Sequence, residues 1–139
     1  MVHIEAIRAE DILEVWLDIR EYIERALKYA LGEYKVSDVL RKIKAGEIIP
    51  LVVYIDNKLT AVLTLELVQM PQKKVMNIMT AGGACMDGWL AEAVEVTDKL
   101  AKEFGADTIS IHGRRGWLKT LAQYKYKDTY TVLTKEVKL

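Results

Sequence analysis

The stretch NIMTAGGACMDGWLAEAVEV (residues 77–96) runs from an apolar pattern through two glycines into a helical pattern. A strand that turns on glycine into a helix is a common anion site, because unpaired backbone N–H groups and the positive end of the helix dipole attract phosphate. Gly82 and Gly83 would let the backbone approach such a ligand closely. Asp87 competes with the ligand, since a carboxylate near a helix start caps the same donors. The stretch therefore predicts a strand, a phosphate-holding turn and a helix.

The spacing of apolar residues predicts the other elements. Steps of three and four residues indicate helices, and β-branched or alternating runs indicate strands. Asp56 and Asn57 fall between two such runs, and Asn tolerates the left-handed conformation of a tight hairpin. The expected strands are residues 2–7, 51–55, 58–68, 73–80, 107–113 and 128–137, and the expected helices are residues 9–31, 37–46, 89–104 and 115–123.

The predicted order of elements is β-α-α-β-β-β-α-β-α-β. Antiparallel hairpins come first and a β-α-β crossover second, which predicts a mixed, mostly antiparallel sheet flanked by helices, an α/β or α+β fold. We expect residues 1–139 to form a single domain. The length suffices for one core, and no repeat, low-complexity tract or Pro/Gly linker interrupts the chain.

Charge and cysteine content argue against several classes of protein. Twenty basic and twenty acidic residues cancel, so the chain has no global field to attract nucleic acid or an anionic membrane. The lone cysteine, Cys85, cannot form an internal disulfide, which suits a reducing compartment. No secretory signal is visible, and charges break every apolar stretch before the ~20 residues that a membrane span needs. We expect a cytoplasmic protein with no nucleic-acid or membrane partner.

The succession of elements, with the glycine turn opening the third helix, resembles the GNAT family of acetyl-CoA-dependent N-acetyltransferases across nearly the whole chain. The family signature at the end of the fourth strand is Arg or Gln, two residues, Gly, one residue, then Gly or Ala. In MTAGGA (residues 79–84), Gly82 and Ala84 fit the last two positions, whereas Met79 occupies the Arg/Gln position. The resemblance implies that acetyl-CoA is bound, through its pyrophosphate, by the backbone at Met79, Ala81, Gly82, Gly83 and Ala84.

A second landmark is RRGWLKTLAQYKY (residues 114–126). GNAT proteins often have Asn near the start of this helix, then an aliphatic stretch, Leu-Tyr and a Gly-Phe pair. With Tyr126 at the final aromatic position, Arg114 falls where Asn is expected and Leu121 falls where Tyr is expected. In the family that Tyr often protonates the departing thiolate, which leucine cannot do. Tyr124, three residues on, is the alternative acid.

Two arginines give this segment a local positive charge. Arg114 and Arg115 carry forked donors that suit a phosphate of coenzyme A or an acidic partner. The competing interpretation is a solvated helix start. Positive charge is mildly unfavourable at that end of a helix, which favours a functional role.

An N-acetyltransferase usually needs a base to deprotonate its acceptor amine. Glu66 lies in LTLELV, where apolar neighbours would make a carboxylate a stronger base, although an outward-facing strand residue fits the same pattern. His112 ends a strand and is a base, a ligand or a hydrogen-bonded rim residue. Cys85 lacks the His and orienting group that a nucleophile needs. No metal-ligand spacing joins His3, His112 and Cys85, so no metal is expected.

More narrowly, the AGG turn, MDGWLAEA and IHGRRGW resemble small GNAT-like proteins encoded by tailed bacteriophages, which often lie among virion and morphogenesis genes. Two functions are therefore open. One is acetyl-CoA-dependent N-acetylation of an unknown amine. The other is a catalytically degenerate GNAT-fold protein with a structural or virion-assembly role, whose partners are other phage structural proteins in the host cytoplasm or the virion. A homo-oligomer is compatible with both.

Overall fold

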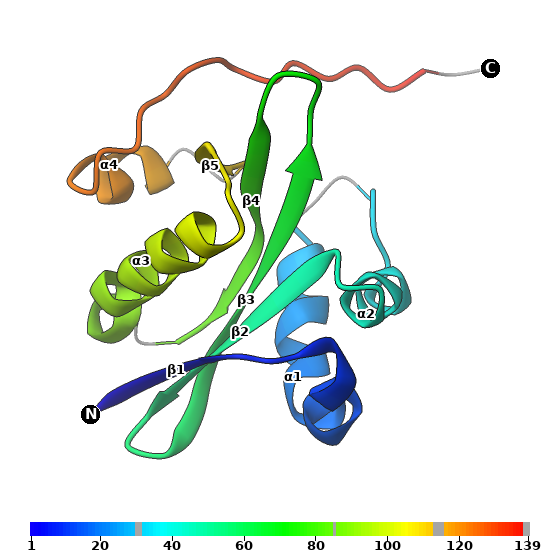
Figure 1. The fold of residues 1–139 in the computed structure, drawn as a ribbon, viewed down its shortest axis with the longest axis vertical. Helices are drawn as coiled ribbons and strands as arrows, with labels where there is room; N and C mark the ends of the chain where they lie inside the picture. Colours follow the sequence, from blue (N-terminus) through cyan, green and yellow to red (C-terminus); the bar gives the residue numbers. More distant parts are fainter. Residues whose placement is uncertain (30–31, 85, 113–115, 138–139) are drawn as a thin grey trace.

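The computed structural model of this chain describes residues 1–29, 32–84, 86–112 and 116–137. A five-stranded sheet with the order β1-β2-β3-β4-β5 forms its centre (Figure 1). The strands are β1 (Val2–Ala6), β2 (Ile48–Ile55), β3 (Lys58–Gln69), β4 (Lys74–Gly83) and β5 (Thr108–Ile111).

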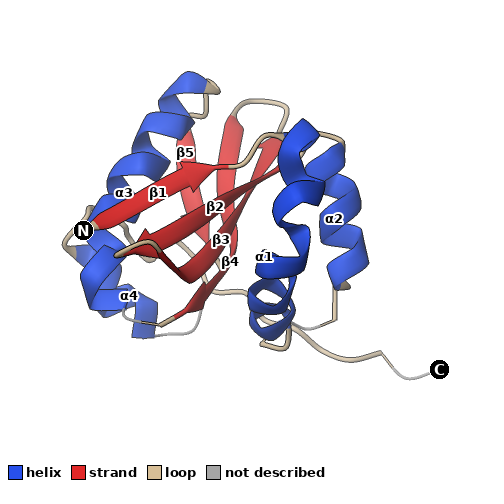
Figure 2. Cartoon of the chain, turned by 90° about the horizontal axis from the view of Figure 1, so that it is seen from below, coloured by secondary structure: helices blue, strands red, loops and turns tan. Residues whose placement is uncertain are grey.

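Helices cover both faces of the sheet (Figure 2). One face, the α1/α2 face, carries α1 (Ile12–Leu27) and α2 (Val36–Lys44), with the short 3-10 helix Ala9–Asp11 before them. The other, the α3/α4 face, carries α3 (Met86–Glu103) and α4 (Gly116–Ala122).

Each face of the sheet has its own buried core. Val62 packs with the α1/α2 cluster, and its neighbour Leu63 packs with the α3/α4 cluster. Successive strand residues point to opposite faces, so the almost continuous apolar run on β3 contributes side chains to both cores. The resulting layers are helices, sheet and helices.

The strand connections agree with the sequence prediction. Neighbouring strands pair antiparallel from β1 to β4, and β4 pairs parallel with β5 across the crossover helix α3. Asp56 and Asn57 form the β2–β3 turn with φ of 50° and 66°. The predicted mixed, mostly antiparallel α/β fold is confirmed, and the order of elements matches through α4.

Two boundaries differ from the sequence prediction. β4 continues through Gly82 and Gly83, so both glycines belong to the strand rather than to the turn that follows it. Residues 128–137, expected as a strand, pair with no strand that the structure describes and are exposed along their length. Thr, Tyr and Val favour strand geometry, but a strand forms only where a neighbouring strand accepts its hydrogen bonds.

Candidate functional site

The last residues of β4 extend beyond the end of β5 and do not pair with it. The parallel pairing of the two strands stops at Ile78 and Ile111, whereas β4 runs on to Gly83. A register shift in the β3–β4 pairing makes Met79 the extra residue of a β-bulge. β5 ends at Ile111, so the part of β4 beyond the bulge has no residue of β5 beside it (Figure 1). We call residues 79–83 the open edge of β4.

The backbone donors of the open edge follow strand alternation. The N–H of Ala84 bonds to the Thr60 carbonyl at 3.1 Å, and the N–H of Thr80 bonds to Thr64 Oγ1 at 3.1 Å. Both therefore point toward β3. Because successive N–H groups of a strand point to opposite edges, those of Ala81 and Gly83 point toward the open side. These two N–H groups are available to an anion there.

The start of α3 lies next to these donors in the chain. Asp87 stands in the first turn of α3 and is exposed, but it makes no hydrogen bond with a described residue. Among the described residues, no backbone donor is therefore capped by the Asp87 side chain. Trp89 is only 2% exposed, and its indole N–H donates to the Ala84 carbonyl at 2.8 Å. That bond ties the residue after β4 to the first turn of α3.

The two glycines of the open edge are required by the chain's own packing. A Cβ on Gly82 would lie 3.1 Å from the Tyr22 carbonyl oxygen of α1. Gly83 has a φ of +146°, and a Cβ there would collide with the Thr60 carbonyl and with Ala61. The missing side chains thus make room for α1 and β3. An anion can use the Gly83 N–H, but the glycines are not evidence for a cradle by themselves.

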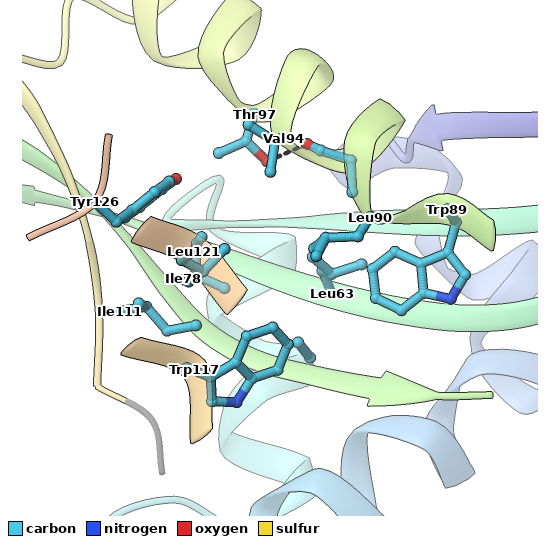
Figure 3. Close-up of a pocket in the computed structure, with 12 residues that line it drawn as sticks. Leu63, Ile78, Trp89, Leu90, Val94, Thr97, Ile111, Trp117, Leu121 and Tyr126 are labelled. Carbon is cyan, nitrogen blue, oxygen red and sulfur yellow. Dashed lines mark hydrogen bonds between the residues drawn. The ribbon is translucent and has the colours of Figure 1, made fainter. Parts of the chain in front are cut away.

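A small cavity lies on the α3/α4 face beside the open edge. It measures about 20 Å³, room for about one water molecule, and lies between α3, α4, β4 and β5 (Figure 3). Leu121 lines it and is 4% exposed, so the residue at the position of the family's tyrosine does face this region. Tyr126 also lines it, whereas Tyr124 packs against the core without reaching the cavity.

Tyr126 is the one phenol on the cavity wall among the described residues. Burial, with a smaller effect from the negative charge of Asp98, raises the pKa of Tyr126 to about 12. Its hydroxyl therefore stays protonated at neutral pH. The sequence placed Tyr126 in a structural aromatic position, and its spacing gave no sign of a polar role.

The raised pKa of Tyr126 predicts a loss of stability in alkali. Between pH 10 and 12 the unfolded tyrosine ionises while the folded one stays neutral, so stability present below pH 10 is lost as pH rises. Urea unfolding from pH 9 to 11.5 should show the wild type losing about 1–2 kcal/mol more than Tyr126→Phe. Tyr130→Phe, at a 69% exposed position, is the matched control and should behave as wild type. Equal slopes in all three proteins would contradict the prediction.

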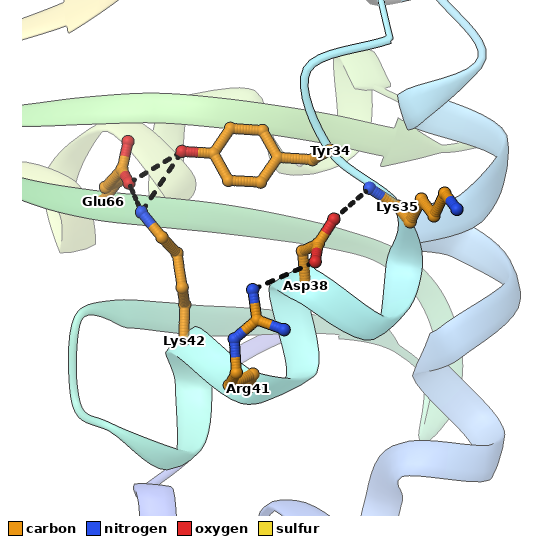
Figure 4. Close-up of polar contacts among 6 residues, drawn as sticks. All are labelled: Tyr34, Lys35, Asp38, Arg41, Lys42 and Glu66. Carbon is orange, nitrogen blue, oxygen red and sulfur yellow. Dashed lines mark hydrogen bonds and ion pairs between the residues drawn. The ribbon is translucent and has the colours of Figure 1, made fainter.

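Glu66 lies on the α1/α2 face in a polar cluster (Figure 4). Its Oε2 accepts hydrogen bonds from Lys42 Nζ at 2.7 Å and from the Tyr34 hydroxyl at 3.2 Å. Lys42 Nζ also lies 5.2 Å from the centre of the Tyr34 ring. The bond to Glu66, then the bond to Tyr34, raises the pKa of Lys42 above its ordinary value. Glu66 thus faces a cation rather than the apolar surroundings that its sequence neighbours suggested.

The remaining predicted site residues are dispersed. His112 is exposed directly after β5, without a described partner. The Met79 side chain packs against the core of the α1/α2 face and so does not face the α3/α4 cavity. Arg114, Arg115 and Cys85 lie outside the described residues. The structure brings Ala81 and Gly83 to one edge, but it joins no predicted catalytic residue to them by a contact.

Two kinds of feature are absent from the residues that the structure describes. Within the described residues, no group of three or more His, Cys, Asp or Glu side chains is arranged to hold a metal ion. No helix in the described part of the chain combines the length and apolar composition needed to cross a membrane.

Comparison with known proteins gives structural matches alone. No protein-family model and no curated protein sequence matches this chain. A predicted acetyltransferase from Clostridium acetobutylicum, solved with acetyl-CoA, has a TM-score of 0.72 at 13% identity, covering 98% of this chain and 96% of that chain. An aminoglycoside acetyltransferase from an uncultured soil metagenomic sample, in complex with trehalose, has a TM-score of 0.69 at 12% identity, covering 99% and 97%. A transcriptional regulator from Bacillus halodurans C-125 has a TM-score of 0.70 at 15% identity, covering 99% and 100%.

These matches establish the fold. The chain has the GNAT-type fold of the acetyltransferases it resembles, as the order of its elements predicted. A transcriptional regulator is among the matches, and one fold carries many functions. The activity has to be argued from the site.

Proposed function

We propose that this chain is a member of the GNAT superfamily that binds acetyl-CoA at the open edge of β4 and transfers the acetyl group to an amine. The observation that carries the proposal is that β4 runs past the end of β5, which leaves the N–H groups of Ala81 and Gly83 without a strand partner among the described residues, beside the start of α3. Backbone donors next to a helix start suit a pyrophosphate. The Clostridium acetobutylicum acetyltransferase, which has the same fold, was solved with acetyl-CoA.

The residues of the open edge fit the pyrophosphate end of acetyl-CoA. Ala81 and Gly83 offer backbone N–H groups, and the first turn of α3 adds the favourable end of a helix dipole. Met79 supplies no charge at the signature's first position, so binding rests on the backbone and on Arg114 and Arg115, which the sequence places before α4. When bound, acetyl-CoA supplies an activated thioester for transfer to the amine.

The acceptor amine would have to lose a proton. Glu66 accepts a hydrogen bond from Lys42 at 2.7 Å on the α1/α2 face, so its Oε2 is already engaged. His112 is exposed after β5 and has no described partner, which makes it the better placed base. The structure offers no catalytic tyrosine at position 121, so solvent protonates the departing thiolate in this scheme. Positioning and backbone polarisation of the carbonyl then provide the main catalytic effects.

A non-enzymatic role is the second candidate, favoured by two observations. By the sequence resemblance Leu121 falls where the family has its catalytic tyrosine, and the cavity that Leu121 lines measures only about 20 Å³. A pantetheine arm does not enter that volume unless α4 or its side chains move. In this candidate the fold serves a structural or assembly role, for which the sequence resemblance suggests a bacteriophage particle.

A thermal-shift experiment separates the two candidates. Acetyl-CoA at ten times its Kd would stabilise the native protein by about 1.4 kcal/mol, which raises Tm by about 3–5 °C for a chain of this size. Ala81→Pro removes one of the two outward N–H groups and should lose most of the shift. ADP as ligand tests the pyrophosphate end alone. Release of free thiol with a panel of amines then tests transfer.

The outcomes assign the function. No shift at millimolar acetyl-CoA would reject acetyl-CoA binding and leave the structural role. A shift without thiol release, with any amine of the panel, would retain binding and reject transfer. A shift that persists unchanged in Ala81→Pro would move the ligand away from the open edge of β4.

A further inference from the structure

Two threonines meet at the β-bulge of β4 and are almost completely shielded from water. Thr64 of β3 is 0% exposed, and Thr80 of β4 is 7% exposed. They pair across the two strands, and Thr80 directly follows the extra residue Met79. The only other buried hydroxyl side chain among the described residues is that of Thr97, in α3. The buried hydroxyl groups of the described sheet are therefore concentrated at the bulge.

The two threonine hydroxyls are hydrogen-bonded to the β4 backbone and to each other. The N–H of Thr80 donates to Thr64 Oγ1 at 3.1 Å, and the two Oγ1 atoms share a second hydrogen bond. The Thr64 hydroxyl thus holds the backbone and the side chain of Thr80 at the same time. Burying polar groups is costly unless they are paired, so these bonds favour one path of the β4 backbone over its alternatives.

Thr80 lies between the bulge and the outward N–H groups of the open edge. A bulge disrupts the hydrogen-bond ladder locally, so the direction of the strand beyond it depends on what holds the first residue after it. Thr64 provides that hold from β3, a strand that is paired on both sides. With the Thr80 N–H directed at Thr64, strand alternation directs the N–H groups of Ala81 and Gly83 to the open side.

We propose that Thr64 is a positioning residue for the anion site: its hydroxyl, through the N–H of Thr80, directs the N–H groups of Ala81 and Gly83 toward the ligand. This inference rests on the proposed function, because these N–H groups are the donors assigned to the pyrophosphate of acetyl-CoA. Donors that are already ordered before the ligand arrives bind it more tightly, since less ordering accompanies binding. Thr64 is fully buried and touches no ligand itself.

The first test uses the free protein and needs no ligand. Thr64→Val keeps the shape of the side chain and removes the acceptor of the Thr80 N–H. In NMR spectra of 15N-labelled protein, the Ala81 amide signal should move, and the Thr80 amide should exchange with solvent about tenfold faster. Thr64→Ser, which keeps the hydroxyl, should retain the wild-type behaviour. Thr97→Val is the matched control, because it removes an equally buried hydroxyl that is bonded within its own helix at 2.8 Å.

The results of this test decide the role of Thr64. An Ala81 signal that stays in place in Thr64→Val, or that moves equally in Thr64→Ser, overturns the proposal. If Thr64→Val does not fold, the wild type supplies the measurement. A nuclear Overhauser effect is then expected between the Thr80 amide proton and a slowly exchanging hydroxyl proton of the threonine pair, and its absence overturns the proposal.

The second test measures the consequence for binding. ADP is the probe, because it presents a pyrophosphate without the acetyl-pantetheine arm. Titration calorimetry should give a Kd about tenfold weaker for Thr64→Val than for the wild type, whereas Thr64→Ser and Thr97→Val should stay within about twofold. An unchanged Kd in Thr64→Val, with wild-type binding intact, rejects the positioning role alone. A wild type that binds neither ADP nor acetyl-CoA rejects the proposed function, and with it any role of Thr64 toward a pyrophosphate.

Discussion

Gly83→Ala is expected to lower the free energy of unfolding by about 2–6 kcal/mol. The new Cβ would lie 2.5 Å from the Cα and Cβ of Ala61 and closer still to the Thr60 carbonyl oxygen. These are atoms of the paired strand β3 and cannot swing aside. Overpacking of this kind costs about 1–3 kcal/mol, and a φ of +146° adds about 1–3 kcal/mol for an alanine. Domains of this size have about 5–15 kcal/mol in total, so the variant would lose a large part of its stability.

Gly46→Ala is the matched control for this prediction. Gly46 also has a positive φ, +79°, but a Cβ there meets nothing within 4 Å. It therefore carries the backbone strain without the collision, and we expect a loss of about 1–2 kcal/mol. Urea unfolding followed by circular dichroism measures both variants. If Gly83→Ala costs no more than Gly46→Ala, the collision with β3 does not exist.

The glycines show where sequence reasoning succeeds and where it stops. The pattern around residues 77–96 correctly predicted a strand followed by a helix. It assigned Gly82 to the turn, but Gly82 lies in β4, where a Cβ would approach the Tyr22 carbonyl oxygen at 3.1 Å. That contact joins residues sixty positions apart. Local pattern shows that a glycine is needed, and only the packed fold shows which neighbour requires it.

The candidate site follows the same rule. Glu66 has apolar neighbours in the sequence, but its partner Lys42 comes from α2, twenty-four positions earlier. The sequence LTLELV alone therefore could not predict the ion pair between Glu66 and Lys42. Leu121 is the opposite case, because motif spacing alone placed it at the tyrosine position and the structure puts it on the cavity wall. Spacing within one helix is local information, whereas the pairing of side chains across elements is not.

The prediction of a strand at residues 128–137 was wrong for a different reason. Its composition favours a strand, and in this single chain it has no partner. Strand propensity describes how well a segment fits beside another strand, so it cannot say whether that strand belongs to the same chain.

Trp89→Ala is expected to lower the free energy of unfolding by about 3–5 kcal/mol. Trp89 is 2% exposed and packs between α3 and the sheet, where it also lines the small cavity. Removing the indole merges its volume with that cavity, and the cost of a core truncation grows with the void left behind. The variant also loses the hydrogen bond to the Ala84 carbonyl, a contribution of about 1 kcal/mol, at the turn from β4 into α3.

Two further variants separate these contributions. Trp89→Phe keeps most of the ring but deletes the N–H donor, so we expect a loss of about 1–2 kcal/mol. Phe104→Ala removes an aromatic ring that is 41% exposed near the end of the same helix, and should cost less than about 1 kcal/mol. Urea unfolding measures all three. A cost for Trp89→Ala no larger than that for Phe104→Ala would mean that Trp89 does not seal the core beneath the turn, and the open edge of β4 would lose the support that holds its donors in place.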